Sequence, residues 1–268
     1  MKNIKRVRLF VNNNIKSRKV AKTLKEALEK KKFTIVEDED DFDLGIAVGG
    51  DGSFLRMIKE SNFNSDVYYV GVNAGTLGFA QEVNLNEINK FITNLSKKEV
   101  IFDEIGIQEV EISTPRETSK LYSLNEIVIR DEELNTTSLD IKVDNILLEH
   151  YTGDGILIAT SFGSTAYNLS FGGSVVYNTF NTLQITPIAP LNNKTYHSLS
   201  NSVIIPSSKK ITLIPKRHGG NLIVTVDGDN NFYNNVTKIE TFIENKSIKI
   251  IRKKDYNFIQ KINDKFLS

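Results

Sequence analysis

Residues 49–53, Gly-Gly-Asp-Gly-Ser, surround one aspartate with glycines early in the chain. The apolar run at residues 44–48 precedes this segment and an apolar stretch at 54–58 follows it, which is the pattern of a strand, a turn and a helix. Glycines let the backbone approach a bulky anionic ligand, and the N–H groups at the start of a helix bind phosphate. We therefore expect Asp51 to act as a catalytic carboxylate that accepts a proton from an attacking hydroxyl group. Helix capping by Asp51 is the alternative, structural interpretation.

Two further glycine-rich regions repeat this theme. One is the loop at residues 71–79, which follows an apolar strand expected at 67–72, and the other comprises residues 153–155 and 163–167. In doubly wound sheets, ligands bind outside the carboxyl ends of the strands, where the loops at 49–53 and 71–79 are expected to lie. The chain has neither a Gly-x-x-x-x-Gly-Lys-Ser/Thr loop nor a Rossmann Gly-x-Gly-x-x-Gly pattern. The glycine loops thus indicate a nucleotide-binding site of a type other than the P-loop or the Rossmann dinucleotide site.

The composition limits the partners of the chain. Its 268 residues include 34 basic and 33 acidic side chains, so the net charge is +1. A chain this close to neutral has no overall electrostatic attraction for nucleic acid or an anionic membrane. No apolar run approaches the roughly 20 residues that a membrane-spanning helix needs. The absence of cysteine excludes disulfides and thiolate catalysis, and His150, His197 and His218 share no metal-ligand spacing. We expect a cytoplasmic protein that binds neither nucleic acid nor membranes and supplies no metal site of its own.

Strands alternate with helices in the first hundred residues. The expected strands are 6–12, 33–36, 44–48 and 67–72, the expected helices are 17–32, the segment after Gly52 and 84–95, and an acidic solvated loop is expected at 37–43. Such alternation predicts a parallel, Rossmann-like sheet covered on both faces, that is, an α/β domain over residues 1–100. The tail at 255–267 has apolar residues at helical spacing, so we expect residues 252–268 to pack back on this domain.

Beyond residue 100 the pattern changes to short strands separated by turns. The expected strands are 105–112, 124–130, 139–143, 146–150, 155–159, 203–205, 211–214, 222–226, 239–243 and 247–251. Asp144 and Asn145 indicate a tight hairpin, and helical structure is expected only at 165–176 and 178–182. Residues 101–251 therefore predict a mostly-β, β-sandwich-like domain, with the active site in a cleft between the two domains.

These motifs resemble those of the NAD kinase family. Residues 49–55 resemble the nucleotide-binding motif that NAD kinases share with diacylglycerol kinases, sphingosine kinases and phosphofructokinases. Residues 153–155 and 160–173 resemble the second signature of NAD kinases, of the bacterial type that uses ATP or polyphosphate. Residues 124–126, 189–193 and 226–228 resemble three further segments of the family. Two departures are Ser53, where the family usually has Thr, and Ser161, where it usually has Pro.

The resemblance implies that the γ-phosphoryl group of ATP, or polyphosphate in its place, is transferred to the 2′-hydroxyl of the adenosine ribose of NAD, giving NADP, with Asp51 as general base. It assigns NAD binding to Gly52, Arg56, Asn125, Glu126, Asp154, Phe162, Thr165, Ala166, Tyr167, Asn168, Ser170 and Ala189. It assigns the ATP phosphates to Gly49, Gly50, Ser53, Asp227 and Gly228. Mg²⁺, or another divalent metal ion, is expected to arrive with ATP, without an assigned protein ligand. Relatives of this kind are usually homotetramers, so we expect the same assembly.

Two other functions remain open at this point. A lipid kinase would share the first glycine motif, but the chain has the segment 163–167 and lacks an amphipathic basic face suited to a membrane surface. A dinucleotide sensor without turnover would keep NAD binding, but it would not need Asp51 as a base. We favour an NAD kinase over both.

Overall fold

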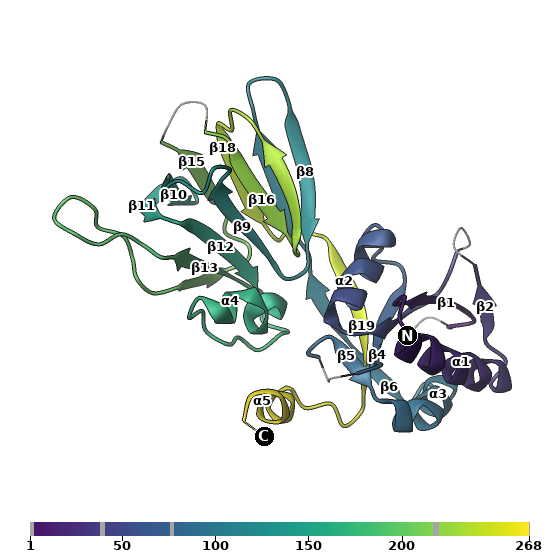
Figure 1. Ribbon diagram of the computed structural model, residues 1–268. Coiled ribbons are helices and arrows are strands. Elements are labelled where there is room, and N and C mark those ends of the chain that lie inside the picture. The colour runs from purple at the N-terminus through teal and green to yellow at the C-terminus, as the bar shows by residue number, and fades with distance from the viewer. Residues whose placement is uncertain (1–2, 38–40, 76–77, 217–219, 268) are drawn as a thin grey trace. The chain divides into compact units, whose positions relative to one another are not determined.

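The computed structural model describes residues 3–37, 41–75, 78–216 and 220–267. The chain forms two compact units, the first made of Met1–Ile105 with Ser247–Ser268 and the second of Gly106–Lys246 (Figure 1). The first unit is therefore discontinuous in sequence, because the chain leaves it at residue 105 and returns to it at residue 247.

The first unit is built on a seven-stranded sheet. Its strands are β1 (Arg6–Val11), β2 (Thr34–Val36), β3 (Leu44–Gly49), β4 (Tyr68–Asn73), β5 (Gln81–Val83), β6 (Val100–Gly106) and β19 (Ser247–Lys253). They lie in the order β2-β1-β3-β4-β19-β6, with β5 also paired to β4. The ladders that join β1 to β2 and β3, and β4 to β3, β5 and β19, are all parallel. The predicted Rossmann-like sheet is confirmed, whereas β5 is too short to show a strand pattern in the sequence.

Helices cover both faces of this sheet. α1 (Ile15–Lys30) and α3 (Ile88–Ser96), the latter preceded by the 3₁₀ turn η1 (Leu85–Glu87), pack on one face (Figure 1). There Leu24 and Phe91 join a core cluster with strand residues such as Ile46. α2 (Asp51–Glu60) packs on the other face, where the Met57 side chain lies against Gly45. In the described parts of the chain, no helix has the length and apolar character to cross a membrane.

The strand β19 lies in the sheet of the first unit, although its sequence pattern placed residues 247–251 in the β-rich domain. It pairs in parallel with β4, with Lys249 opposite Tyr68 and Ile250 opposite Tyr69. Its apolar side chains are fully buried because a parallel strand is covered on both faces. A short apolar run of this kind shows that a strand is present but not which sheet it joins.

The C-terminal helix α5 (Phe258–Phe266) packs on the first unit, as the sequence predicts. Asn257 caps it by accepting hydrogen bonds from the N–H groups of Ile259 and Gln260. The Phe79 ring lies 6.4 Å from the Phe258 ring and 5.2 Å from the Phe266 ring, measured between centroids. α5 is thus held by an aromatic contact with the loop before β5.

The second unit contains two antiparallel sheets of six strands each. One sheet has the order β11-β10-β15-β18-β7-β8, with β7 (Gln108–Ser113), β8 (Thr118–Ser123), β10 (Thr137–Val143), β11 (Ile146–Gly153), β15 (Ile211–Pro215) and β18 (Lys238–Phe242). The other has the order β14-β13-β12-β9-β16-β17, with β9 (Glu126–Asp131), β12 (Gly155–Thr160), β13 (Thr182–Ile188), β14 (Val203–Pro206), β16 (Leu222–Val226) and β17 (Asp229–Tyr233). One core cluster joins residues of both sheets, among them Ile141 and Ile158. The predicted sandwich-like arrangement is confirmed.

Local predictions in the second unit had mixed outcomes. The hairpin at Asp144 and Asn145 is present, with φ values of 49° and 68° that suit a type I′ turn between β10 and β11. The helical predictions were largely wrong: residues 165–176 contain only the last residue of η2 (Phe162–Thr165) and the short helix α4 (Tyr167–Ser170), and 178–182 form no helix. The strand β13 was missed, although it pairs with both β12 and β14. Its polar residues and Pro187 interrupt the apolar alternation that marks a strand.

Candidate active site

Asp51 is the first residue of α2 and directly follows the N-cap residue Gly50. Its carboxylate oxygens accept hydrogen bonds from the backbone N–H groups of Phe79 and Ala80, each at 2.9 Å. The backbone of Gly78 lies against this carboxylate, since a Cβ at Gly78 would come within 2.0 Å of Oδ1. Each oxygen accepts one of these bonds and retains a further lone pair. Asp51 is therefore fixed in place and still able to accept a proton.

The glycines beside Asp51 serve two different purposes. A Cβ at Gly49 would lie 2.2 Å from Ser53 Oγ, so this position needs glycine for packing. Gly50 and Gly52 face open space, which leaves their backbone accessible to a ligand. Ser53 is buried and accepts a hydrogen bond from the Asn12 side chain at 3.2 Å, so its hydroxyl is held by the protein itself.

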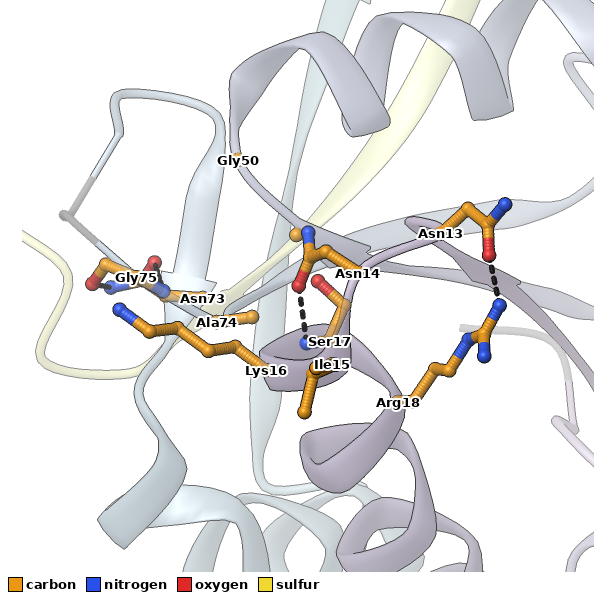
Figure 2. Close-up of a pocket in the computed structure, with 11 residues that line it drawn as sticks. Asn13, Asn14, Ile15, Lys16, Ser17, Arg18, Gly50, Asn73, Ala74 and Gly75 are labelled. Atoms are coloured by element: carbon orange, nitrogen blue, oxygen red, sulfur yellow. Dashed lines mark hydrogen bonds between the residues drawn. The ribbon is translucent and has the colours of Figure 1, made fainter.

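A cavity of about 600 Å³ lies at the carboxyl ends of β1, β3 and β4 (Figure 2). It is lined by Asn13, Asn14, Ile15, Lys16, Ser17, Arg18, Gly49, Gly50, Asn73, Ala74 and Gly75. The Lys16 side chain extends toward the 73–75 loop, and Asn13 accepts a hydrogen bond from Arg18. The glycines of this cavity were predicted from the sequence, whereas residues 13–18 were not. Their signal was the loop that follows the first predicted strand at the same edge of the sheet.

Arg56, predicted to bind NAD, lies in α2 and is exposed. Its Nε atom forms an ion pair with Glu60 at 3.8 Å, one helical turn further along. An exposed pair of this kind contributes little stability, so the guanidinium remains available to a ligand.

Asp227 holds the loop that contains Asn125 and Glu126 in the second unit. Its Oδ1 atom accepts hydrogen bonds from Ser123 Oγ (2.8 Å) and from the N–H groups of Asn125 (2.7 Å) and Glu126 (3.2 Å), and Oδ2 accepts one from the N–H of Leu124 (2.7 Å). With Gly228 it forms the turn between β16 and β17. The carboxylate expected to face ATP phosphates therefore binds four donors of its own chain.

Glu126 is buried beside Asp227. Burial and the negative charge of Asp227 raise the pKa of Glu126 to about 8, while a hydrogen bond from the Tyr167 N–H opposes this shift. Among the residues that the structure describes, Glu126 Oε2 has no hydrogen-bond partner. The raised pKa favours the protonated form of Glu126, which can donate a hydrogen bond.

The loop with Asn125 and the segment that follows β12 are in direct contact. Thr160 Oγ1 donates a hydrogen bond to the Leu124 carbonyl (2.6 Å) and accepts one from the Gly163 N–H (3.0 Å). A Cβ at Gly163 would lie 2.1 Å from the Asn125 carbonyl oxygen. The structure therefore brings together two motifs that are separated in the sequence.

The predicted NAD-binding residues of the 162–170 segment differ in exposure. Tyr167 and Ser170 are exposed, Thr165 and Ala166 are half-buried, and Phe162 and Asn168 are buried. Asn168 accepts a hydrogen bond from Thr186 Oγ1 (2.6 Å) and donates one to the Ser164 carbonyl (3.3 Å). Asn168 thus supports the segment from inside.

Asp154 and Ala189 lie together at the start of β12, the end remote from Glu126. The Asp154 N–H donates to the Ile188 carbonyl (3.0 Å), and both Asp154 and Ala189 are exposed. Arg130, which the sequence analysis missed, donates to the Tyr167 hydroxyl at 3.3 Å. Tyr167 also packs edge-on against Phe171, with ring centroids 4.8 Å apart.

In the described ranges, no group of three or more His, Cys, Asp or Glu side chains could hold a metal ion. His150 binds Asp140 at 2.6 Å. His218 and residues 76–77 of the glycine-rich loop at 71–79 lie outside the described residues, as do residues 38–40 of the acidic stretch. A divalent ion at this site would take most of its ligands from phosphate and water.

An α/β unit with glycine loops at the carboxyl edge of its sheet and a fixed aspartate at a helix N-terminus has the features expected of a nucleotide-dependent phosphotransferase. Family models for the ATP-NAD kinase N-terminal and C-terminal domains match residues 5–100 and 124–252. The chain therefore belongs to the NAD kinase family and is a kinase.

Full-length relatives agree with this assignment. The chain is 38% identical to an NAD kinase of Finegoldia magna over 273 residues, which cover 99% of each protein. It is 34% identical to an NAD kinase of Streptococcus pyogenes serotype M3 over 276 residues, which cover 98% of the chain and 95% of the relative.

Solved structures share the fold. Yeast NADH kinase complexed with NADH has a TM-score of 0.87 at 21% identity, and the match covers 100% of the chain and 89% of that protein. An Archaeoglobus fulgidus NAD kinase in complex with ATP has a TM-score of 0.75 at 21% identity, and the match covers 97% and 98%.

Proposed function

We propose that Asp51 is the general base that accepts the proton of the 2′-hydroxyl of the adenosine ribose of NAD when this hydroxyl receives the γ-phosphoryl group of ATP. The 2′-hydroxyl gives its proton to Asp51 as its oxygen forms a bond to the γ-phosphorus, and ADP leaves with the electrons of the broken P–O bond. The anchoring of Asp51 by two backbone N–H groups supports this role, because phosphoryl transfer is catalysed mainly by positioning and charge.

The cavity beside Gly49 and Gly50 suits the phosphates of ATP. It combines open glycine backbone with the cations of Lys16 and Arg18 at the start of α1. These donors bind phosphate through charge-assisted hydrogen bonds. A polyphosphate chain presents the same chemistry, so this cavity accommodates either donor.

Mg²⁺ fits this site as an ion carried by the phosphates. The donors present here are N–H groups and cations, which bind phosphate oxygens rather than a metal. When bound, Mg²⁺ neutralises charge between the phosphates. The chain's contribution is to hold the phosphates and Asp51 in place.

The second unit supplies the residues that suit NAD. The protonated Glu126 can donate a hydrogen bond to a ribose oxygen, and Asn125 adds an amide beside it. Tyr167 offers an exposed ring, and Asp154 and Ala189 provide a carboxylate and a backbone for the nicotinamide side. Asn168 and Asp227 position these groups from inside. We also propose that the enzyme is cytoplasmic and forms a homotetramer. Light scattering after size-exclusion chromatography measures its molar mass and so tests the homotetramer.

The experiment is NADP formation from NAD with Mg-ATP, followed with an NADP-specific dehydrogenase, with polyphosphate and a diacylglycerol substrate in parallel. We expect NADP with ATP or polyphosphate and no lipid phosphate. NAD binding without NADP would support the sensor function instead, and lipid phosphate would support the lipid kinase.

A further inference from the structure

A lysine of the C-terminal helix lies next to the segment that holds Asp51. Lys261 is 8% exposed, and its ammonium group donates a hydrogen bond to the carbonyl oxygen of Gln81. Gln81 directly follows Phe79 and Ala80, whose N–H groups bind the Asp51 carboxylate. One short stretch of backbone therefore connects Lys261 to Asp51.

The same helix contacts this stretch a second time through aromatic packing. The rings of Phe258 and Phe266, both in α5, lie against the ring of Phe79. Phe79, which donates to one Asp51 oxygen, is thus held by apolar contact with α5. Gln81, which follows the second donor Ala80, is held by Lys261. α5 therefore contacts both ends of the Phe79–Gln81 segment, which positions the Asp51 carboxylate.

Charged groups from three other elements surround the Lys261 ammonium. Burial and the positive charge of Arg252 lower the pKa of Lys261 to about 8, and Lys253 acts in the same direction. The negative charges of Glu82 and Asp51 oppose the shift. The Tyr256 ring also lies 5.5 Å from the ammonium. Lys261 is therefore a buried cation close to the segment that binds Asp51.

Glu82 alone does not account for a lysine at this position. Its carboxylate already binds Arg252 at 3.2 Å and accepts a hydrogen bond from the Lys253 N–H at 3.0 Å, whereas Lys261 Nζ lies 4.0 Å away. A buried charge is costly, and an apolar side chain of similar volume is often as stable or more stable. Lys261 is therefore better explained by its effect on Asp51 than by a contribution to folding.

We propose that Lys261 is a positioning residue for Asp51, because it fixes the Phe79–Gln81 backbone that binds the carboxylate. This inference rests on the proposed role of Asp51 as the base. It makes the C-terminal helix part of the catalytic support, although the helix is remote in sequence from every motif of the site.

The test is steady-state kinetics of Lys261→Met in the full-length enzyme. We expect kcat to fall by about tenfold to a hundredfold with KM for NAD and ATP nearly unchanged, because a 1 Å displacement of a catalytic group can cost about a hundredfold. Lys261→Arg should restore part of kcat. Lys265→Met removes the same charge from an exposed position of α5 and serves as the control.

The double variant Asp51→Asn/Lys261→Met distinguishes the two proposals. If Lys261 acts through Asp51, the double variant should be no slower than Asp51→Asn alone. Wild-type kcat in Lys261→Met beside an inactive Asp51→Asn would overturn the inference and leave the base intact. Wild-type kcat in Asp51→Asn would overturn both. If Lys261→Met does not fold, Lys261→Gln, which keeps a donor for the Gln81 carbonyl without the charge, replaces it, with the same outcomes decisive.

Discussion

Replacing Asp51 by Asn tests the proposed base with little change in shape. General-base catalysis by a positioned side chain contributes about 10²–10⁴-fold, so we expect kcat to fall by at least ~10²-fold, which corresponds to about 2.7 kcal/mol. NAD affinity should stay near the wild-type value, since most residues proposed to bind NAD lie in the second unit. The assay is NADP formation with saturating Mg-ATP, with NAD binding measured by calorimetry.

The structure adds a second consequence of this substitution. Asn has one acceptor oxygen, whereas Phe79 and Ala80 present two N–H groups to the carboxylate. One N–H would then face the Asn amide group, which costs about 1–3 kcal/mol for a buried donor and less at this half-buried site. Urea denaturation should therefore show a modest loss of unfolding free energy.

Asp66→Asn is the matched control, because it removes a carboxylate from an exposed position of the same unit. It should leave both kcat and stability close to the wild type. Wild-type turnover in a folded Asp51→Asn enzyme would refute the proposed base and leave Asp51 as an anchor for the 79–80 backbone. A loss of turnover matched by an equal loss of NAD affinity would point to binding instead.

Three further substitutions test the support of the site. Lys16→Met should raise KM for ATP by about tenfold, as expected for one lost charge-assisted contact, with KM for NAD unchanged; an equal rise in both would contradict the phosphate cavity. Glu126 has a raised pKa, so its contribution to the unfolding free energy is present below pH 4.5 and lost as pH rises to about 8. Glu126→Gln should remove that decline in urea titrations at several pH values, and an unaltered pH profile would show that Glu126 is ionised. Asp227→Asn should lower the unfolding free energy by about 2–4 kcal/mol through weakened hydrogen bonds to four donors, and a fully stable variant would contradict its anchoring role.

The features that the sequence predicted best depend on neighbouring residues. The strand, turn and helix around Asp51 and the hairpin at Asp144 have local signals, because glycine, asparagine and aspartate mark particular backbone conformations. Two other features depend on which strands are neighbours in the sheet: the sheet that β19 joins, and the presence of residues 13–18 in the cavity lining. Sheet order is a property of the whole fold, so no local pattern carries it.

The side-chain roles that the sequence missed all depend on partners far away in the chain. Asp227 binds the N–H of Asn125 across 102 positions, and Lys261 binds the Gln81 carbonyl across 180. Each residue looks like an ordinary polar side chain in its own segment. The Asp-Gly motif at 227–228 marked a turn correctly but could not reveal what its carboxylate binds.

The two anchored aspartates, Asp51 and Asp227, differ in how many further hydrogen bonds their carboxylates can accept in the folded chain. Asp51 accepts one backbone N–H on each oxygen, while Asp227 accepts three donors on Oδ1 and one on Oδ2. A carboxylate has about two lone-pair sites on each oxygen, so Asp51 keeps one on each oxygen for a hydroxyl group, whereas Asp227 keeps one only on Oδ2. Both sit next to a glycine in motifs shared with the family, so the motif alone does not separate a base from an anchor. The number of donors already bound differs between them, and it favours Asp51 for the proposed role as the base.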